Sequence, residues 1–135
     1  MITAVDTSVL LDVLEPDPAF GQRSAATLRE CVAQGSIVAC DVVWAELAAW
    51  SPSPERFAQA THGLGLRFDP LGADAAALAG TLWRSYRNRG GPRTRIVTDL
   101  LIGAHAATRA DRLLTRDRGF YRRYFGDLAI LDPTV

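Results

Sequence analysis

The sequence has 135 residues, and its 48% hydrophobic and 22% charged composition is typical of a globular domain and excludes a disordered or fibrous chain. Its 15 basic and 15 acidic residues give a formal charge of +0, which excludes a general attraction to polyanions, so any nucleic-acid binding must use local patches. No apolar run approaches the roughly 20 residues that span a bilayer. We therefore expect one cytoplasmic domain, residues 1–135, without a membrane segment.

In chain order, short apolar runs alternate with segments of helical spacing. Residues 2–5 predict a strand that ends at Asp6, and a helix follows to about residue 14, before Pro16 and Pro18. The remaining predicted elements are a helix over 19–34, a strand over 37–40, helices over 42–50 and 53–62, a strand over 64–68, helices over 74–89 and 95–109, a strand over 113–115, a short helix, and a strand over 128–131.

Short, continuous apolar strands that alternate with helices are typical of parallel strands buried on both faces. The predicted fold class is therefore α/β, a three-layer α/β/α sandwich around a central, mostly parallel sheet of four to five strands. In such sheets, ligands bind at the carboxyl ends of the strands, near the point where the strand order switches.

Four acidic residues are placed at or near this edge. Asp6 directly follows the first strand, and Asp117 follows the fourth strand by two residues. Glu46 lies on the edge of the apolar stripe of its helix, and Asp99 opens a largely apolar helix. Four converging carboxylates would raise one another's pKa values unless a cation compensates, an arrangement that folding alone does not require. Asp6, Glu46, Asp99 and Asp117 are therefore the predicted catalytic and metal-binding residues.

The donor types predict a hard divalent cation, Mg²⁺ or Mn²⁺, because such ions prefer oxygen ligands. No zinc site competes, since His62 and His105 are isolated, and Cys31 and Cys40 are expected to be buried free thiols. A metal held by carboxylates can activate water and stabilise charge on a phosphodiester. Hydroxyl groups beside the same edge are auxiliary candidates for holding metal-bound water or phosphate: Thr7, Ser8 and Thr115.

Each acid also has a purely structural interpretation that the sequence leaves open. Asp6 and Asp117 could cap helices, and Asp99 could neutralise a helix N-terminus, a stabilisation of roughly 0.3–1 kcal/mol. Glu46 could be a half-buried surface residue. Asp41, which follows the second predicted strand, is expected to cap the helix after it.

Several motifs resemble those of PIN-domain nucleases, and most closely the VapC-type toxins of bacterial toxin–antitoxin pairs. They occur in the expected order across essentially the whole chain: Val5 to Asp12, Trp44 to Leu47, Thr98 to Ala104, Leu113 to Asp117, and the run Asp117 to Tyr121. The resemblance implies a Mg²⁺- or Mn²⁺-dependent endoribonuclease that hydrolyses RNA phosphodiesters. It further implies a homodimer held inactive by a cognate antitoxin.

The resemblance also maps Asp6, Glu46, Asp99 and Asp117 onto the acidic positions of that family. Some members carry a further acid where this chain has Gly119. The resemblance therefore does not decide whether the site binds one metal ion or two. Asp12 lies one to two helical turns from Asp6, so we expect a structural or peripheral role for it.

Arginines supply the candidate contacts to RNA, because the guanidinium group binds phosphate well. Arg116 and Arg118 flank Asp117 and are the first candidates. The basic segment 84–95 is a second candidate, although a charged loop of this kind is equally explained as solvated surface.

Two other Mg²⁺-binding folds are disfavoured by the sequence. A response-regulator receiver domain needs a pair of adjacent acids and a lysine, whereas Asp6 stands alone and the chain has no lysine. A haloacid-dehalogenase-like phosphatase needs an acid where this chain has Ser8. A PIN fold retained as a protein-binding or regulatory module without turnover stays open as the alternative function.

Overall fold

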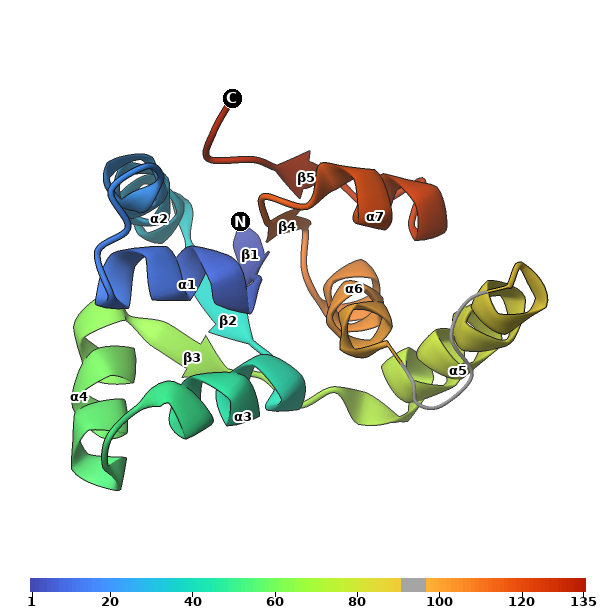
Figure 1. Ribbon diagram of the computed structural model, residues 1–135, viewed down its shortest axis with the longest axis horizontal. Coiled ribbons are helices and arrows are strands. Elements are labelled where there is room, and N and C mark those ends of the chain that lie inside the picture. The colour runs from blue at the N-terminus through green and yellow to red at the C-terminus, as the bar shows by residue number, and fades with distance from the viewer. Residues whose placement is uncertain (91–96) are drawn as a thin grey trace.

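The computed structural model describes residues 1–90 and 97–135 (Figure 1). The strands in these ranges are β1 (Ile2–Val5), β2 (Ser36–Ala39), β3 (Leu66–Phe68), β4 (Arg112–Leu114) and β5 (Ile130–Leu131). The helices are α1 (Thr7–Leu14), α2 (Gly21–Gln34), α3 (Asp41–Trp50), α4 (Pro54–Leu64), α5 (Gly72–Asn88), α6 (Thr98–Arg109) and α7 (Arg118–Tyr124). The predicted alternation of strands and helices is confirmed.

The strands form one sheet in the order β3-β2-β1-β4-β5, with every neighbouring pair parallel. The chain builds outward from β1 to β3 and then returns to the other side of β1 with β4. Val5 pairs with Leu114 at the ends of these two strands, and the Asp6 N–H donates to the Leu114 carbonyl oxygen at 2.9 Å. The switch in strand order therefore lies between β1 and β4, and its open edge carries Asp6.

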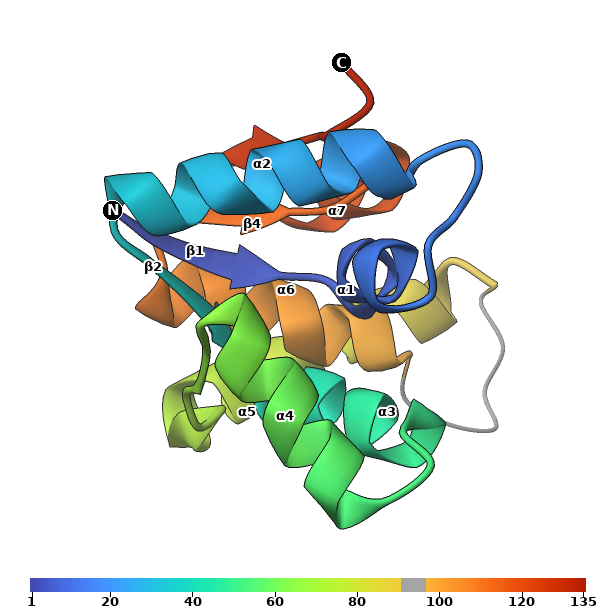
Figure 2. The same ribbon diagram turned by 90° about the vertical axis from the view of Figure 1, so that its left-hand side faces the viewer.

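Helices cover both faces of the sheet, which confirms the predicted three-layer sandwich. Figure 2 shows α2 on one side of β1 and β2, and α6 on the other. Thr3, Ala4 and Val5 are all buried, which explains why β1 is apolar without alternation. Most residues of α6 from Leu100 to Ala106 are buried as well, because this helix packs between the sheet and α5.

Asp41 does not have the capping role predicted for it. Cys40 occupies the N-cap position of α3 and Asp41 is the first helical residue. The Asp41 carboxylate instead accepts the N–H of Leu71 at 2.6 Å and so ties the segment before α5 to α3. Sequence reasoning missed this contact because it joins residues thirty positions apart.

The two cysteines, Cys31 and Cys40, are buried free thiols, as expected. Within residues 1–90 and 97–135, no helix combines the length and the apolarity needed to cross a bilayer. The predicted helix over 95–109 begins at Thr98 in the structure, and residues 91–96 lie outside the described ranges.

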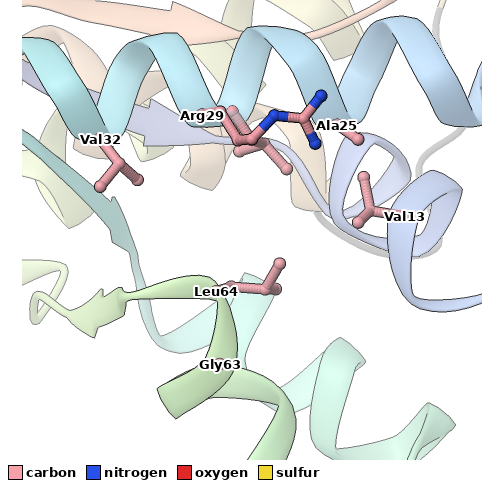
Figure 3. Close-up of a pocket in the computed structure, with 7 residues that line it drawn as sticks. Val13, Ala25, Arg29, Val32, Gly63 and Leu64 are labelled. Atoms are coloured by element: carbon pink, nitrogen blue, oxygen red, sulfur yellow. The ribbon is translucent and has the colours of Figure 1, made fainter.

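An apolar cleft of about 290 Å³ opens between α1, α2 and the end of α4 (Figure 3). Val13 and Leu64 lie on its opposite walls, and Arg29 extends along α2 beside it. None of the four predicted acidic residues lines this cleft, so it is separate from the edge where the acids lie.

Close packing of α6 against the end of α7 depends on Gly103. A Cβ atom built at Gly103 would overlap the ring of Phe125, the buried residue that ends α7. We predict that Gly103→Ala lowers the free energy of unfolding by about 1–3 kcal/mol, because the ring must move within a packed core. Urea denaturation measures this difference.

Gly80→Ala in α5 is the matched control. A Cβ at Gly80 meets no atom within 4 Å, and alanine favours a helix over glycine by about 1 kcal/mol. This variant should be as stable as the wild type or more so. A Gly103→Ala variant that matched it would contradict the close packing of α6 and α7.

Candidate active site

A polar cleft of about 500 Å³ opens at the carboxyl edge of the sheet. It is lined from α1, α3, α6 and the segment after β4 by Asp6, Thr7, Ser8, Leu11, Glu46, Asp99, Arg116 and Asp117. The structure thus brings the four predicted acids together, with two of the three predicted hydroxyl residues beside them. The third, Thr115, is fully buried and contacts Asp6.

Asp6 occupies the N-cap position of α1, but its carboxylate makes no capping hydrogen bond. Its Oδ2 atom instead accepts the Thr115 hydroxyl at 2.8 Å and the Tyr121 hydroxyl at 3.4 Å. Burial raises the pKa of Asp6, since only 8% of the residue is exposed. The side chain is therefore directed at the site and does not cap the helix.

Asp99 shows that the four carboxylates act on one another. It lies in the first turn of α6 and also makes no capping hydrogen bond there. Its pKa is raised to about 6, first by burial and then by the negative charges of Asp6, Asp117 and Glu46. The raised pKa means that the ionised form of Asp99 is destabilised, and a bound cation would stabilise that form.

Glu46 is exposed and reaches the cleft from α3. The Thr7 hydroxyl in α1 donates to its Oε1 atom at 2.9 Å. Because this contact joins two helices, it fixes a long side chain that would otherwise sample many rotamers. The sequence-based interpretation of Glu46 as a half-buried surface residue does not account for this contact.

Asp117 combines a structural contact with a place in the cleft. Its Oδ1 atom accepts the Phe120 N–H at 3.4 Å and so caps α7. Its own N–H donates to the Thr115 hydroxyl at 3.0 Å. The hydroxyl of Thr115 therefore connects the Asp6 carboxylate to the backbone of Asp117, across the ends of β1 and β4.

The two arginines beside Asp117 are both paired with acids outside the cleft. Arg116 donates from Nε and Nη2 to the two carboxylate oxygens of Asp12, at 2.9 and 3.1 Å. Asp12 is buried and also accepts the Ser24 hydroxyl, which agrees with the structural role expected for it. Arg118 pairs with Asp132 at 2.8 Å and does not line the cleft. Of the two predicted RNA contacts, only Arg116 lines the cleft.

The basic segment 84–95 is described only in part. Arg84, Arg87 and Arg89 belong to α5 and its C-terminal end, whereas Arg93 and Arg95 lie outside the described residues. The Arg87 guanidinium stacks over the Trp83 ring at 4.4 Å from its centroid. No described contact links these arginines to the acidic cleft.

Tyr121 is a site residue that sequence reasoning missed. It is fully buried, and its hydroxyl contacts Asp6 and lowers the pKa of Asp99 against the effect of burial. A signal was present, because Tyr121 follows Asp117 by four residues and therefore lies on the same face of α7. A buried tyrosine usually needs a partner for its hydroxyl, and the nearby acids are suitable partners.

The donor set fits a hydrated divalent cation. The four acids offer carboxylate oxygens, which are the ligands that Mg²⁺ and Mn²⁺ prefer. In the part of the chain that the structure describes, no three acidic, histidine or cysteine side chains are close enough to hold one ion directly. Mg²⁺ usually keeps several waters and takes only one or two carboxylates, so this spacing is compatible with such an ion.

Comparison with known proteins identifies a family and a set of similar folds. A family model described as PIN domain matches residues 3–126. A VapBC2 complex from Rickettsia felis contains a chain with 20% identity and a TM-score of 0.68, covering 98% of both chains. A VapBC complex from Salmonella typhimurium gives 19% identity and a TM-score of 0.69, again covering 98% of both chains.

FitAcB from Neisseria gonorrhoeae gives 23% identity and a TM-score of 0.68 over 99% of both chains. At these identities, the similarity of the solved structures shows a shared fold. No curated protein matches the sequence.

Asp99→Asn tests the repulsion among the carboxylates. Folding raises the pKa of Asp99 from 3.8 to about 6, so the folded protein binds the proton more tightly and wild-type stability falls as pH rises across this interval. Asparagine carries no charge. In chelator at about pH 7.5, we predict that Asp99→Asn is more stable than the wild type by roughly 1 kcal/mol, after allowance for solvent screening.

Thermal melts across the acidic pH range measure this effect, and the difference should vanish below about pH 4. Asp74→Asn is the control, because Asp74 lies in the first turn of α5, is exposed, and does not line the cleft. It should lose a few tenths of a kcal/mol at most through the helix dipole. Destabilisation of Asp99→Asn at neutral pH would instead favour a helix-stabilising role for Asp99.

Proposed function

The chain belongs to the PIN domain family, whose members are nucleases, and on this premise we propose that it is a metal-dependent endoribonuclease. One observation carries the proposal. Four carboxylates, two of them just after β1 and β4 and the others in α3 and α6, line a single cleft, and their mutual repulsion helps to raise the pKa of Asp99 to about 6. Such a cluster is unfavourable for folding alone and becomes favourable when a cation binds.

The residues that would hold Mg²⁺ or Mn²⁺ are Asp6, Glu46, Asp99 and Asp117. When bound, such an ion lowers the pKa of a water molecule and stabilises the charge that develops on a phosphodiester. The chain itself supplies the orientation. Thr7, which lines the cleft, donates to Glu46, and the buried Thr115 contacts both the Asp6 carboxylate and the backbone N–H of Asp117.

Arg116 is the favoured contact to the RNA backbone. Its Nε and Nη2 atoms donate to Asp12, and its planar guanidinium stacks over the Phe20 ring, with Cζ 4.2 Å from the ring centroid. The fixed guanidinium is partly exposed and lines the cleft, so its remaining N–H groups are available to a phosphate. Arg118 is the second candidate, but it would have to leave Asp132 to reach a substrate.

We also propose that the protein is the toxin of a toxin–antitoxin pair, acts in the cytoplasm as a homodimer, and is held inactive by a cognate antitoxin protein. Chains of similar fold occur in VapBC complexes from Rickettsia felis and Salmonella typhimurium and in a toxin–antitoxin complex from Klebsiella pneumoniae.

Cleavage of RNA tests the nuclease proposal directly. Purified protein, freed of any antitoxin, is incubated with a mixed RNA pool in Mg²⁺, Mn²⁺ or EDTA. We expect metal-dependent cleavage that falls at least about a hundredfold in Asp99→Asn, because the loss removes charge stabilisation worth several kcal/mol. The exposed-site control Asp74→Asn should cleave like the wild type. Cleavage that persists in EDTA or in Asp99→Asn would refute the acidic site.

Expression without an antitoxin tests the toxin proposal. We predict that the wild-type protein arrests bacterial growth, whereas Asp6→Asn, made at the same soluble level, does not. Growth curves with matched immunoblots provide the measurement. Unimpaired growth at confirmed soluble expression of the wild type would contradict the toxin assignment but not the nuclease chemistry. A protein that binds metal and cleaves no RNA would favour a PIN-fold binding module.

A further inference from the structure

Tyr121 lies behind the residues that line the acidic cleft. Tyr121 belongs to α7, and its side chain is fully buried and does not line the cleft. Figure 1 shows α7 beside β4 and α6, the two elements that bring Asp117 and Asp99 to the site. Its hydroxyl is directed at the Asp6 carboxylate, 3.4 Å from Oδ2. Tyr121 can therefore act on the site only through the acids.

We propose that Tyr121 is a positioning residue that fixes the Asp6 carboxylate for cation binding. The inference rests on the proposed function, because it assigns a role toward the same cation. The new element is that part of the affinity for the cation depends on Tyr121, a residue that is not one of the four acids.

The hydrogen bonds at Asp6 give the first argument. Thr115 and Tyr121 both donate to Oδ2, from the end of β4 and from α7. Two donors on one oxygen oppose rotation of the carboxylate about its side-chain bond. No side-chain donor in residues 1–90 and 97–135 contacts Oδ1, and the carboxylate is further contacted by the backbone of Thr7.

The charge of the site gives the second argument. A phenol donates a hydrogen bond without carrying a positive charge, so it can stabilise the charge of Asp6 without neutralising the site. A tyrosine hydroxyl has an ordinary pKa of about 10, so at neutral pH it keeps its proton and remains a hydrogen-bond donor. An arginine or lysine in this place would compete with the cation for the same oxygens.

Aromatic packing gives the third argument, because it holds the hydroxyl in place. The Tyr121 ring packs edge-on against Phe120, with centroids 5.3 Å apart, and lies 6.4 Å from the Phe125 ring. Phe125 in turn lies against Gly103 in α6. The Tyr121 hydroxyl is therefore held in place by aromatic packing that also contacts α6, the helix that carries Asp99.

Binding of Mn²⁺ to Tyr121→Phe tests the proposal without any need for cleavage. The variant keeps the packing of the ring and removes only the hydroxyl. Free Mn²⁺ is measured by electron paramagnetic resonance during titration of the intact protein, and melting temperatures are recorded in chelator. We expect the Kd for Mn²⁺ to rise about tenfold or more, as is typical when a residue that orients a metal ligand is removed.

Tyr124→Phe is the matched control. Tyr124 lies in the same helix and packs against Phe120 and Tyr86, and no hydrogen bond joins it to an acid of the site. This variant should bind Mn²⁺ like the wild type. Weakened binding in Tyr121→Phe alone, with its fold retained, would support the positioning role.

The other outcomes overturn the proposal in distinguishable ways. Unchanged or tighter Mn²⁺ binding by Tyr121→Phe would show that the hydroxyl does not position Asp6, and would leave the proposed nuclease function intact. Unfolding of Tyr121→Phe would show that the hydroxyl serves the core alone. Absence of Mn²⁺ binding by the wild type would refute the metal-dependent function itself, and this inference with it.

Discussion

Repulsion among the carboxylates at the carboxyl edge of the sheet is the constraint that the rest of the structure must satisfy. The fold meets it with partial charges and neutral donors. The N-termini of α1, α6 and α7 lie at this edge, and the positive ends of their dipoles lie beside Asp6, Asp99 and Asp117. The hydroxyls of Thr115 and Tyr121 add hydrogen bonds to Asp6. Together these groups reduce the energetic cost of placing the carboxylates close together, and they leave the negative charge of the site in place.

The same constraint explains where the nearby arginines go. Arg116 and Arg118 flank Asp117 in sequence, and either could have neutralised it. Asp12 and Asp132, whose side chains are each only 5% exposed, bind these guanidinium groups instead. The pairs keep positive charge close to the cleft but directed away from its carboxylates. The cleft therefore stays negative where a cation would bind, with a guanidinium at its rim.

The sequence predicted the sheet and the convergence of the acids, because both follow from local patterns and from one topological rule. Apolar runs locate the strands, and the carboxyl ends of parallel strands share an edge, which places Asp6 near Asp117. The contacts that orient the acids were not predicted. Tyr121 and Asp6 are 115 positions apart, and Arg116 and Asp12 are 104 apart, so no local spacing records these pairings. Asp41 was misjudged for the same reason.

The pairing of β1 with β4 has a consequence for the order of folding. The hydrogen bond between Thr115 and Asp6 joins residues separated by 109 positions, so it closes nearly the whole chain into a loop. Contacts of such long range form slowly, and during synthesis the N-terminal elements are available first. A growing polypeptide that already carries Asp6, Glu46 and Asp99 still lacks β4 and α7. The cleft is therefore completed only after β4 and α7 have been synthesised and have docked beside β1.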